Sequence, residues 1–106
     1  MSYRYMRLLV FFDLPMENGQ DRRAYARFRK LLIKSGFIMM QKSVYSKLAV
    51  NQTAADAALD LVRKQKPARG TIQAMIITEK QYARMEYILG SRSGDILDSD
   101  ERFVEL

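Results

Sequence analysis

The amino-acid sequence predicts an α+β fold, in which helices cover one face of an antiparallel sheet. Two observations lead to this prediction. Segments with the apolar alternation of strands are separated by segments with the apolar spacing of helices. Residues 6–12 are apolar on both sides of the chain, which is typical of a central strand. The length of 106 residues suits a single domain.

The first predicted strand ends in a carboxylate. Asp13 follows the apolar stretch, and Pro15 then forces the chain out of the sheet, because proline has no N–H and disfavours helical geometry at Leu14. Ligands often gather at the carboxyl ends of buried strands. Asp13 is therefore a candidate functional residue. The alternative is that Asp13 only caps the turn.

A helix is predicted over residues 21–35, with Asn18 or Asp21 as its N-cap and Gly36 as a left-handed residue at its end. One face of this helix is apolar and is expected to cover the sheet. That face consists of Ala24, Tyr25, Phe28, Leu31 and Leu32.

Another face of this helix carries a ridge of four basic residues, spaced four, three and four apart. They are Arg23, Arg27, Lys30 and Lys34. Like charges at this spacing repel one another, and a polyanion bound along the ridge would relieve the repulsion. The alternative is a solvated helix face, although such a face usually carries interspersed acids.

The middle of the chain predicts two further strands and a second helix. Residues 37–50 form one long strand or two short ones, broken near 41–43. The second helix is predicted from Thr53, with Asp56 in a variant of the capping box, to Lys66 before a proline. Basic residues at its end suit the helix dipole and are assigned no function. They are Arg63, Lys64 and Lys66.

The last part of the chain predicts a strand at residues 71–78 and a short helix that ends near Met85. Thr78 and Gln81 have the spacing of a capping box for this helix. Further short strands are predicted at residues 87–89 and 102–106.

This order of elements predicts a ferredoxin-like (βαββαβ) sandwich over residues 1–90, with a C-terminal extension over 91–106 that is expected to contact a partner. Two helices cover one face of the sheet, yet the first strand is apolar on both sides. The second face is therefore expected to pack against a second copy in a face-to-face homodimer.

The charge of the chain is unevenly distributed. Residues 1–52 carry ten Lys and Arg against three acids, whereas residues 53–106 carry eight against nine. A basic half is typical of a nucleic-acid partner. A charged surface that only maintains solubility is the alternative.

The composition excludes several kinds of site. The chain has no Cys and no His, which rules out disulfides, thiolate or imidazole metal ligands and Ser-His catalysis. A metal must therefore be a hard cation such as Mg²⁺, Mn²⁺ or Ca²⁺. No stretch of about 18 apolar residues occurs, and no basic-then-apolar leader is seen. A cytoplasmic protein is expected.

Several segments, in this order, resemble the family of the small CRISPR adaptation protein, the ferredoxin-like partner of the CRISPR integrase, often named a CRISPR-associated endoribonuclease. The segments are Phe12-Asp13-Leu14-Pro15, the basic helix at 22–32, Gly36-Phe37 and Gln41-Lys42-Ser43-Val44-Tyr45. The resemblance covers residues 4–89. The length and residues 78–81 and 99–102 resemble the branch from type II systems.

The resemblance implies a homodimer that bridges two integrase dimers, captures a short foreign DNA duplex and assists its insertion into the CRISPR array. It also implies that Asp13 corresponds to the metal-binding aspartate of the family, which supports Mg²⁺-dependent hydrolysis of RNA or DNA in some members.

The chemistry of the residues favours the scaffold role over the nuclease role. Metal-activated water needs several oxygen ligands, and this chain offers one well-placed carboxylate. Two copies of Asp13 across a two-fold axis could share one Mg²⁺, but there is no His or nearby Lys to act as a general base. A Mg²⁺-dependent endonuclease acting through Asp13 remains the alternative.

For the scaffold role, basic side chains doubled by a two-fold axis would form a positive band along backbone phosphates. The predicted DNA-contacting residues are Arg22, Arg23, Arg27 and Lys30, with Arg4 and Arg7 as weaker candidates. A ferredoxin-like RNA-binding domain would need an aromatic pattern on the central strands that is absent here.

Overall fold

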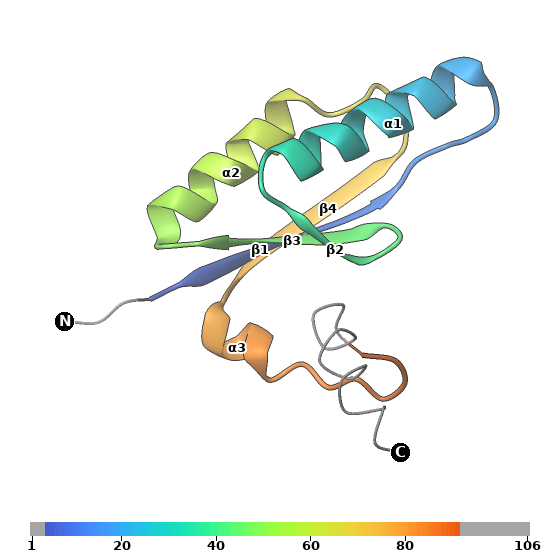
Figure 1. The fold of residues 1–106 in the computed structure, drawn as a ribbon. Helices are drawn as coiled ribbons and strands as arrows, with labels where there is room; N and C mark the ends of the chain where they lie inside the picture. Colours follow the sequence, from blue (N-terminus) through green and yellow to red (C-terminus); the bar gives the residue numbers. More distant parts are fainter. Residues whose placement is uncertain (1–3, 92–106) are drawn as a thin grey trace.

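The computed structural model describes residues 4–91 of the chain. Two long helices lie side by side on one face of a sheet, and a short helix lies on the other face (Figure 1). The helices are α1 (Gly19–Lys34), α2 (Gln52–Lys64) and α3 (Glu79–Ala83). The strands are β1 (Met6–Asp13), β2 (Ile38–Gln41), β3 (Val44–Ala49) and β4 (Thr71–Thr78).

The four strands form one antiparallel sheet in the order β2-β3-β1-β4. β1 is central and pairs with β3 on one side and β4 on the other. β2 and β3 form a hairpin around residues 42–43, which is where the sequence predicts a break. The predicted ferredoxin-like fold is confirmed over the described residues.

The core lies between the sheet and the two long helices. Alternate side chains of β1 point toward the helices and are buried there. The ring of Phe12 packs edge-on against the ring of Phe28, with 5.2 Å between the ring centroids. It stacks on the ring of Tyr45, with 5.6 Å between the centroids. Burying one such side chain contributes about 1.5–3 kcal/mol. The hydroxyl of Tyr45 is buried and has no hydrogen-bond partner among residues 4–91.

Asparagines cap both long helices. Asn18 Oδ1 accepts a hydrogen bond from the Asp21 N–H at 2.8 Å, so α1 begins two residues earlier than predicted. Asn51 Oδ1 accepts one from the Ala54 N–H at 2.8 Å. The predicted start of the second helix at Thr53 is therefore wrong: the extended backbone of Asn51 places its oxygen over the free N–H groups of the first turn.

Gly36 ends the connection from α1 to β2 with a φ of 94°, as the sequence predicts. A Cβ at this position would also lie 2.7 Å from the Lys47 Nζ atom. Glycine therefore satisfies both the backbone conformation and the space at this turn.

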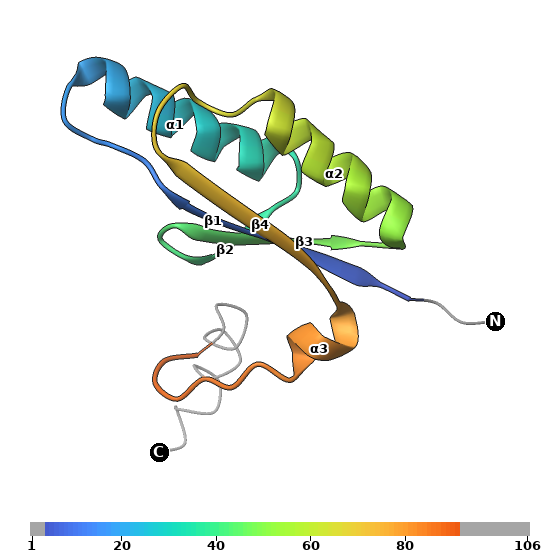
Figure 2. The same ribbon diagram turned by 180° about the vertical axis from the view of Figure 1, so that it is seen from behind.

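The short helix α3 begins with the predicted capping box. The Gln81 N–H donates to Thr78 Oγ1 at 3.0 Å, and the Thr78 N–H donates to Gln81 Oε1 at 2.9 Å. Seen from the front and from behind, α3 lies on the side of the sheet away from α1 and α2 (Figures 1 and 2). The chain itself thus covers one end of the second sheet face.

The predicted strand at residues 87–89 is wrong. Residues 87–89 are not in a strand, and in Figure 1 the chain runs below the sheet after α3. Ile88 and Leu89 are 92% and 93% exposed. The predicted strand at 102–106 lies outside the described residues, and the division of the chain at residue 90 stays a prediction.

Within residues 4–91, no helix combines the length and apolar character needed to cross a membrane.

Candidate nucleic-acid interface

Asp13 is the last residue of β1, opposite Thr71 of β4, and its side chain is exposed. The turn that follows is capped by other residues. Asn18 caps the start of α1, and Asp21 Oδ2 accepts a hydrogen bond from the Glu17 N–H at 3.3 Å. Asn18 and Asp21 therefore cap this turn, and the Asp13 carboxylate is not needed for capping.

Gly70 holds the backbone beside Asp13 in place. Its φ is 108°, and a Cβ on it would lie 2.9 Å from the Asp13 carbonyl oxygen and 2.7 Å from Leu14 Cδ2. The backbone before β4 therefore touches the backbone at the end of β1, and only glycine fits this approach. Asp13 thus stands on a rigid part of the sheet.

One chain does not form a complete metal site around Asp13. Among the described residues, no group of three or more Asp, Glu, His or Cys side chains could hold a metal ion. Mg²⁺ in proteins is usually held by one or two carboxylates together with waters. A metal at Asp13 would thus depend on ligands from outside the described part of this chain.

An ion pair fixes the start of α1 to the segment before β4. Asp21 is 7% exposed, and its two carboxylate oxygens lie 3.1 and 3.4 Å from Arg69 Nη1. Arg69 also lies 3.9 Å from Glu17. Glu17 and Asp21 are therefore both paired with Arg69. Because Arg69 neutralises part of their charge, these two acids offset less of the positive charge of α1 than two unpaired acids would.

The four predicted DNA-contacting residues are all exposed on α1, but they divide into two sets. Arg22 Nη1 lies 3.5 Å from the Met16 carbonyl oxygen, and Arg23 lies beside Gly19. Arg27 and Lys30 instead line a groove between α1 and the end of α2.

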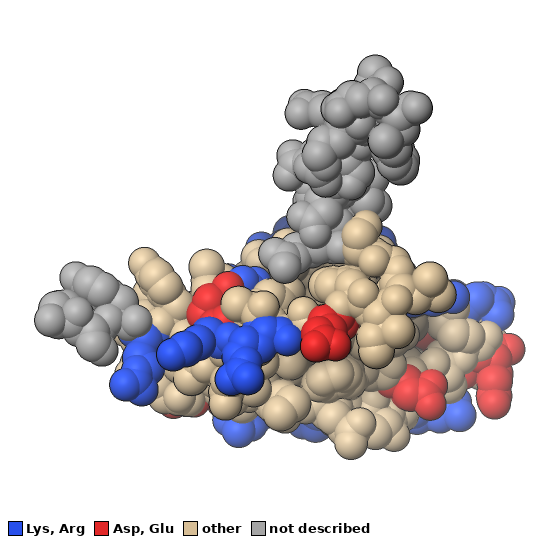
Figure 3. All heavy atoms as spheres, turned by 90° about the horizontal axis from the view of Figure 1, so that it is seen from below, with Lys and Arg blue, Asp and Glu red and all other residues tan. Residues whose placement is uncertain are grey.

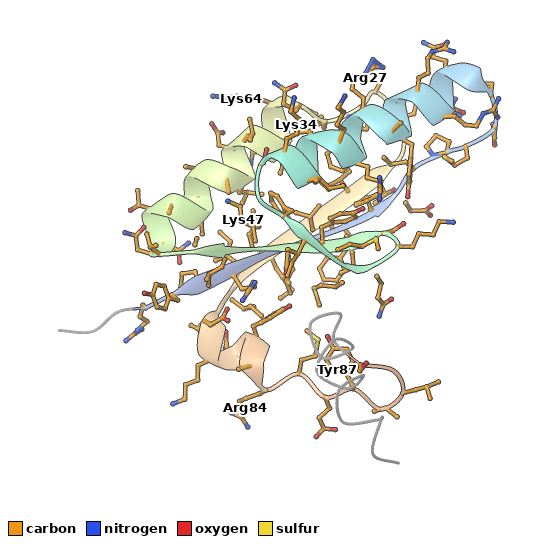
Figure 4. The ribbon with its side chains drawn as sticks, in the orientation of Figure 1. Arg27, Lys34, Lys47, Lys64, Arg84 and Tyr87 are labelled. Atoms are coloured by element: carbon orange, nitrogen blue, oxygen red, sulfur yellow. The ribbon has the colours of Figure 1, made fainter. Side chains whose placement is uncertain are left out.

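This groove has a volume of about 620 Å³ and is lined by five basic residues. They are Arg27, Lys30 and Lys34 from α1, Lys64 at the end of α2, and Lys66 just after it. Within residues 4–91, no Asp or Glu lines this groove. Figure 4 labels Arg27, Lys34 and Lys64, which lie in the helix layer above the sheet.

The sequence gives no sign that Lys64 and Lys66 lie near the basic ridge. Their position at the end of a helix explains a basic residue without any function. Their place opposite the basic ridge follows only from α1 and α2 lying side by side and running in opposite directions (Figure 1).

Arg7 is held within the protein. Its Nε and Nη2 atoms donate to the two carboxylate oxygens of Glu79 at 2.8 and 2.7 Å, and its guanidinium lies 4.1 Å from the centroid of the Tyr82 ring. The Arg7 side chain is 11% exposed, so this residue anchors α3 on the sheet.

Arg4 is exposed beside Glu79 and Lys80. Seen from the α3 side, much of the described surface consists of uncharged residues (Figure 3). The Lys, Arg, Asp and Glu residues on this side are mixed and do not form a region of one charge.

Comparison with known proteins identifies the family. The family described as CRISPR associated protein Cas2 matches residues 6–85. The chain belongs to the Cas2 family. The family expected from the sequence is thereby confirmed, whereas its type II branch stays a prediction.

Relatives in this family match nearly the full chain. The chain is 52% identical over 101 residues to the CRISPR-associated endoribonuclease Cas2 of Treponema denticola, which covers 95% of this chain and 100% of that protein. The protein of the same name from Streptococcus mutans is 45% identical, covering 95% of this chain and 93% of that protein. The one from Ligilactobacillus salivarius is 42% identical, covering 95% and 100%.

Proposed function

We propose that this Cas2 family chain is a homodimeric scaffold in CRISPR spacer acquisition. It bridges integrase dimers and binds the backbone of captured double-stranded DNA, which the integrase inserts into the CRISPR array. Four exposed basic residues of α1 carry this proposal, because no acidic residue follows Asp21 in this helix. They are Arg22, Arg23, Arg27 and Lys30. Such a surface suits backbone phosphates and reads no bases.

The second face of the sheet supports a homodimer. Leu48 of β3 and Met75 of β4 are exposed there, opposite Arg7 and Leu9 of the central strand. Ile38 of β2 extends this apolar surface to the edge of the sheet. Exposed apolar patches of this kind mark interaction sites, and a second copy of the same face is self-complementary about a two-fold axis.

The exposed side chains of Ile88 and Leu89 are the proposed contact for the integrase, together with the extension at 91–106. Two neighbouring aliphatic side chains that are almost fully exposed are suited to a pocket on another protein.

The alternative function is a Mg²⁺-dependent endonuclease. The relatives from Treponema denticola and Streptococcus mutans are named endoribonucleases. In this chain the activity would rest on Asp13 of each protomer, with Mg²⁺ held between the two carboxylates and completed by water. The absence of three clustered ligands within residues 4–91 makes this the weaker of the two proposals.

DNA integration in a reconstituted mixture with the partner integrase tests the proposal. Wild type is compared with Asp13→Ala and with Arg23→Ala/Arg27→Ala. We expect Asp13→Ala to support integration at the wild-type rate and the double arginine variant to fail. If Asp13→Ala abolishes integration while the dimer and the complex still assemble, the carboxylate has a chemical role and the scaffold proposal is refuted.

A further inference from the structure

The groove between α1 and the end of α2 has features that the ridge on α1 alone does not have. Its cations come from two helices, so a chain of phosphates lying in it would meet positive charge from both sides. Its other lining residues include the apolar Phe28 and Leu31. Phe28 is 2% exposed, so its ring offers no open face on which a base could stack.

This lining identifies the chemistry of a ligand. Binding of unpaired bases typically needs exposed aromatic side chains for stacking. Here the polar side chains are five cations and the amides of Gln20 and Gln65, which suit the phosphates of a nucleic acid whose bases are paired and turned away.

Lys64, the last residue of α2, and Lys66, two residues beyond it, have weak partners of their own. Lys64 Nζ lies 3.0 Å from Asp60 Oδ2, in an exposed pair of the kind that adds little to stability. Lys66 Nζ donates to the Arg63 carbonyl oxygen at 3.1 Å. An ammonium group has three donors, so this single bond leaves Lys66 able to contact a phosphate.

We propose that this groove binds the phosphate backbone of one strand of duplex DNA, and that Lys64 and Lys66 contact it together with Arg27, Lys30 and Lys34. The inference rests on the proposed function in one respect, namely that the chain binds duplex DNA. It goes further by assigning DNA contacts to α2, whose end is not part of the basic ridge.

Salt-dependent DNA binding tests the groove. Fluorescence anisotropy is measured with a short fluorescein-labelled duplex, from about 50 to 200 mM salt. Each phosphate contact contributes about 0.9 to the slope of log K against log salt, so Lys64→Gln/Lys66→Gln is expected to lower the slope by about 1.8. We expect about tenfold weaker binding at about 150 mM salt, and equal losses on duplexes of different sequence.

A matched control removes one positive charge from α1 and one from α2, both outside the groove. Arg29→Gln/Arg63→Gln has the same net charge as the groove variant, and neither arginine lines the groove. This control is expected to keep the wild-type slope. Lys64→Arg/Lys66→Arg retains both charges and is expected to keep the affinity within about twofold. Thermal unfolding of all variants checks that the fold is unchanged.

The outcomes separate this inference from the proposed function. If Lys64→Gln/Lys66→Gln has the same slope as the control while Arg22→Gln/Arg23→Gln binds more weakly, the groove assignment is overturned and DNA binding by α1 stands. If none of these variants changes the affinity or the slope, both the groove and the proposed DNA-binding surface are refuted.

Discussion

Replacing Gly70 with alanine tests whether the contact between the segment before β4 and the end of β1 fixes the position of Asp13. The backbone of Gly70 has a φ of 108°, a conformation that costs a residue with a Cβ about 1–2 kcal/mol. The new Cβ would also lie 2.9 Å from the Asp13 carbonyl oxygen and 3.1 Å from Leu14 Cα. These are backbone atoms, so the strand end itself must move.

Gly36 provides the matched control. Its φ of 94° carries the same conformational cost, but its Cβ would meet only the end of the flexible Lys47 side chain, at 2.7 Å. We expect Gly36→Ala to lower the free energy of unfolding by about 1–2 kcal/mol, the conformational cost alone. For Gly70→Ala we expect about 3 kcal/mol, because displacement of backbone adds about 1–3 kcal/mol of overpacking strain.

Urea unfolding followed by circular dichroism measures both variants. Protein concentration must be the same throughout, since self-association changes apparent stability. Equal losses for the two variants would refute the reasoning, because they would show that the atoms of Asp13 and Leu14 do not restrict position 70. A larger loss for Gly36→Ala would refute it as well.

Three further predictions concern the core, α3 and the second sheet face. Tyr45→Phe is expected to raise the free energy of unfolding by about 1 kcal/mol, since the buried Tyr45 hydroxyl has no partner among residues 4–91 and such a group costs about 1–3 kcal/mol; a decrease of that size in urea unfolding would mean that the hydroxyl is hydrogen-bonded. Glu79→Gln weakens the two-point contact that holds α3 on the sheet, and about fivefold faster hydrogen exchange of the α3 amides is expected, corresponding to about 1 kcal/mol; unchanged exchange would contradict an anchoring role. Leu48→Asp/Met75→Asp is expected to shift the chain to monomers in sedimentation velocity, whereas Leu61→Asp, on an exposed position of α2, is not; equal behaviour of the two variants would place the interface elsewhere.

The sequence was sufficient to predict the fold because its local signals agree with its global pattern. The apolar strand at residues 6–12 and the capping box at Thr78 are confirmed by the structure. Of the two alternatives for residues 37–50, the pair of short strands broken near 41–43 is the correct one. The first residue of a helix was harder to predict from the sequence. Asn51 and Thr53 are both good N-caps, and the choice depends on which backbone is extended.

Predictions that depended on long-range contacts were incomplete. Arg7 is one of many basic residues in the sequence, and only the return of the chain at Glu79 reveals its partner. Lys64 joins the ridge of α1 only once the two helices are placed side by side. Residues 87–89 have a strand-like composition, yet composition cannot say whether a free sheet edge lies within reach.

The place of β1 at the centre of the sheet has a consequence for how the chain folds. Its neighbours are β3, which follows about forty residues later, and β4, which lies 72 residues away in sequence where Met6 faces Thr78. The β2–β3 hairpin forms from neighbouring residues, whereas the sheet closes only after the whole of β4 has left the ribosome. Non-local pairings of this kind slow folding. The apolar strand β1, made first, therefore pairs with its last neighbour, β4, only at the end of synthesis. Until then its unpaired edge can associate with other chains.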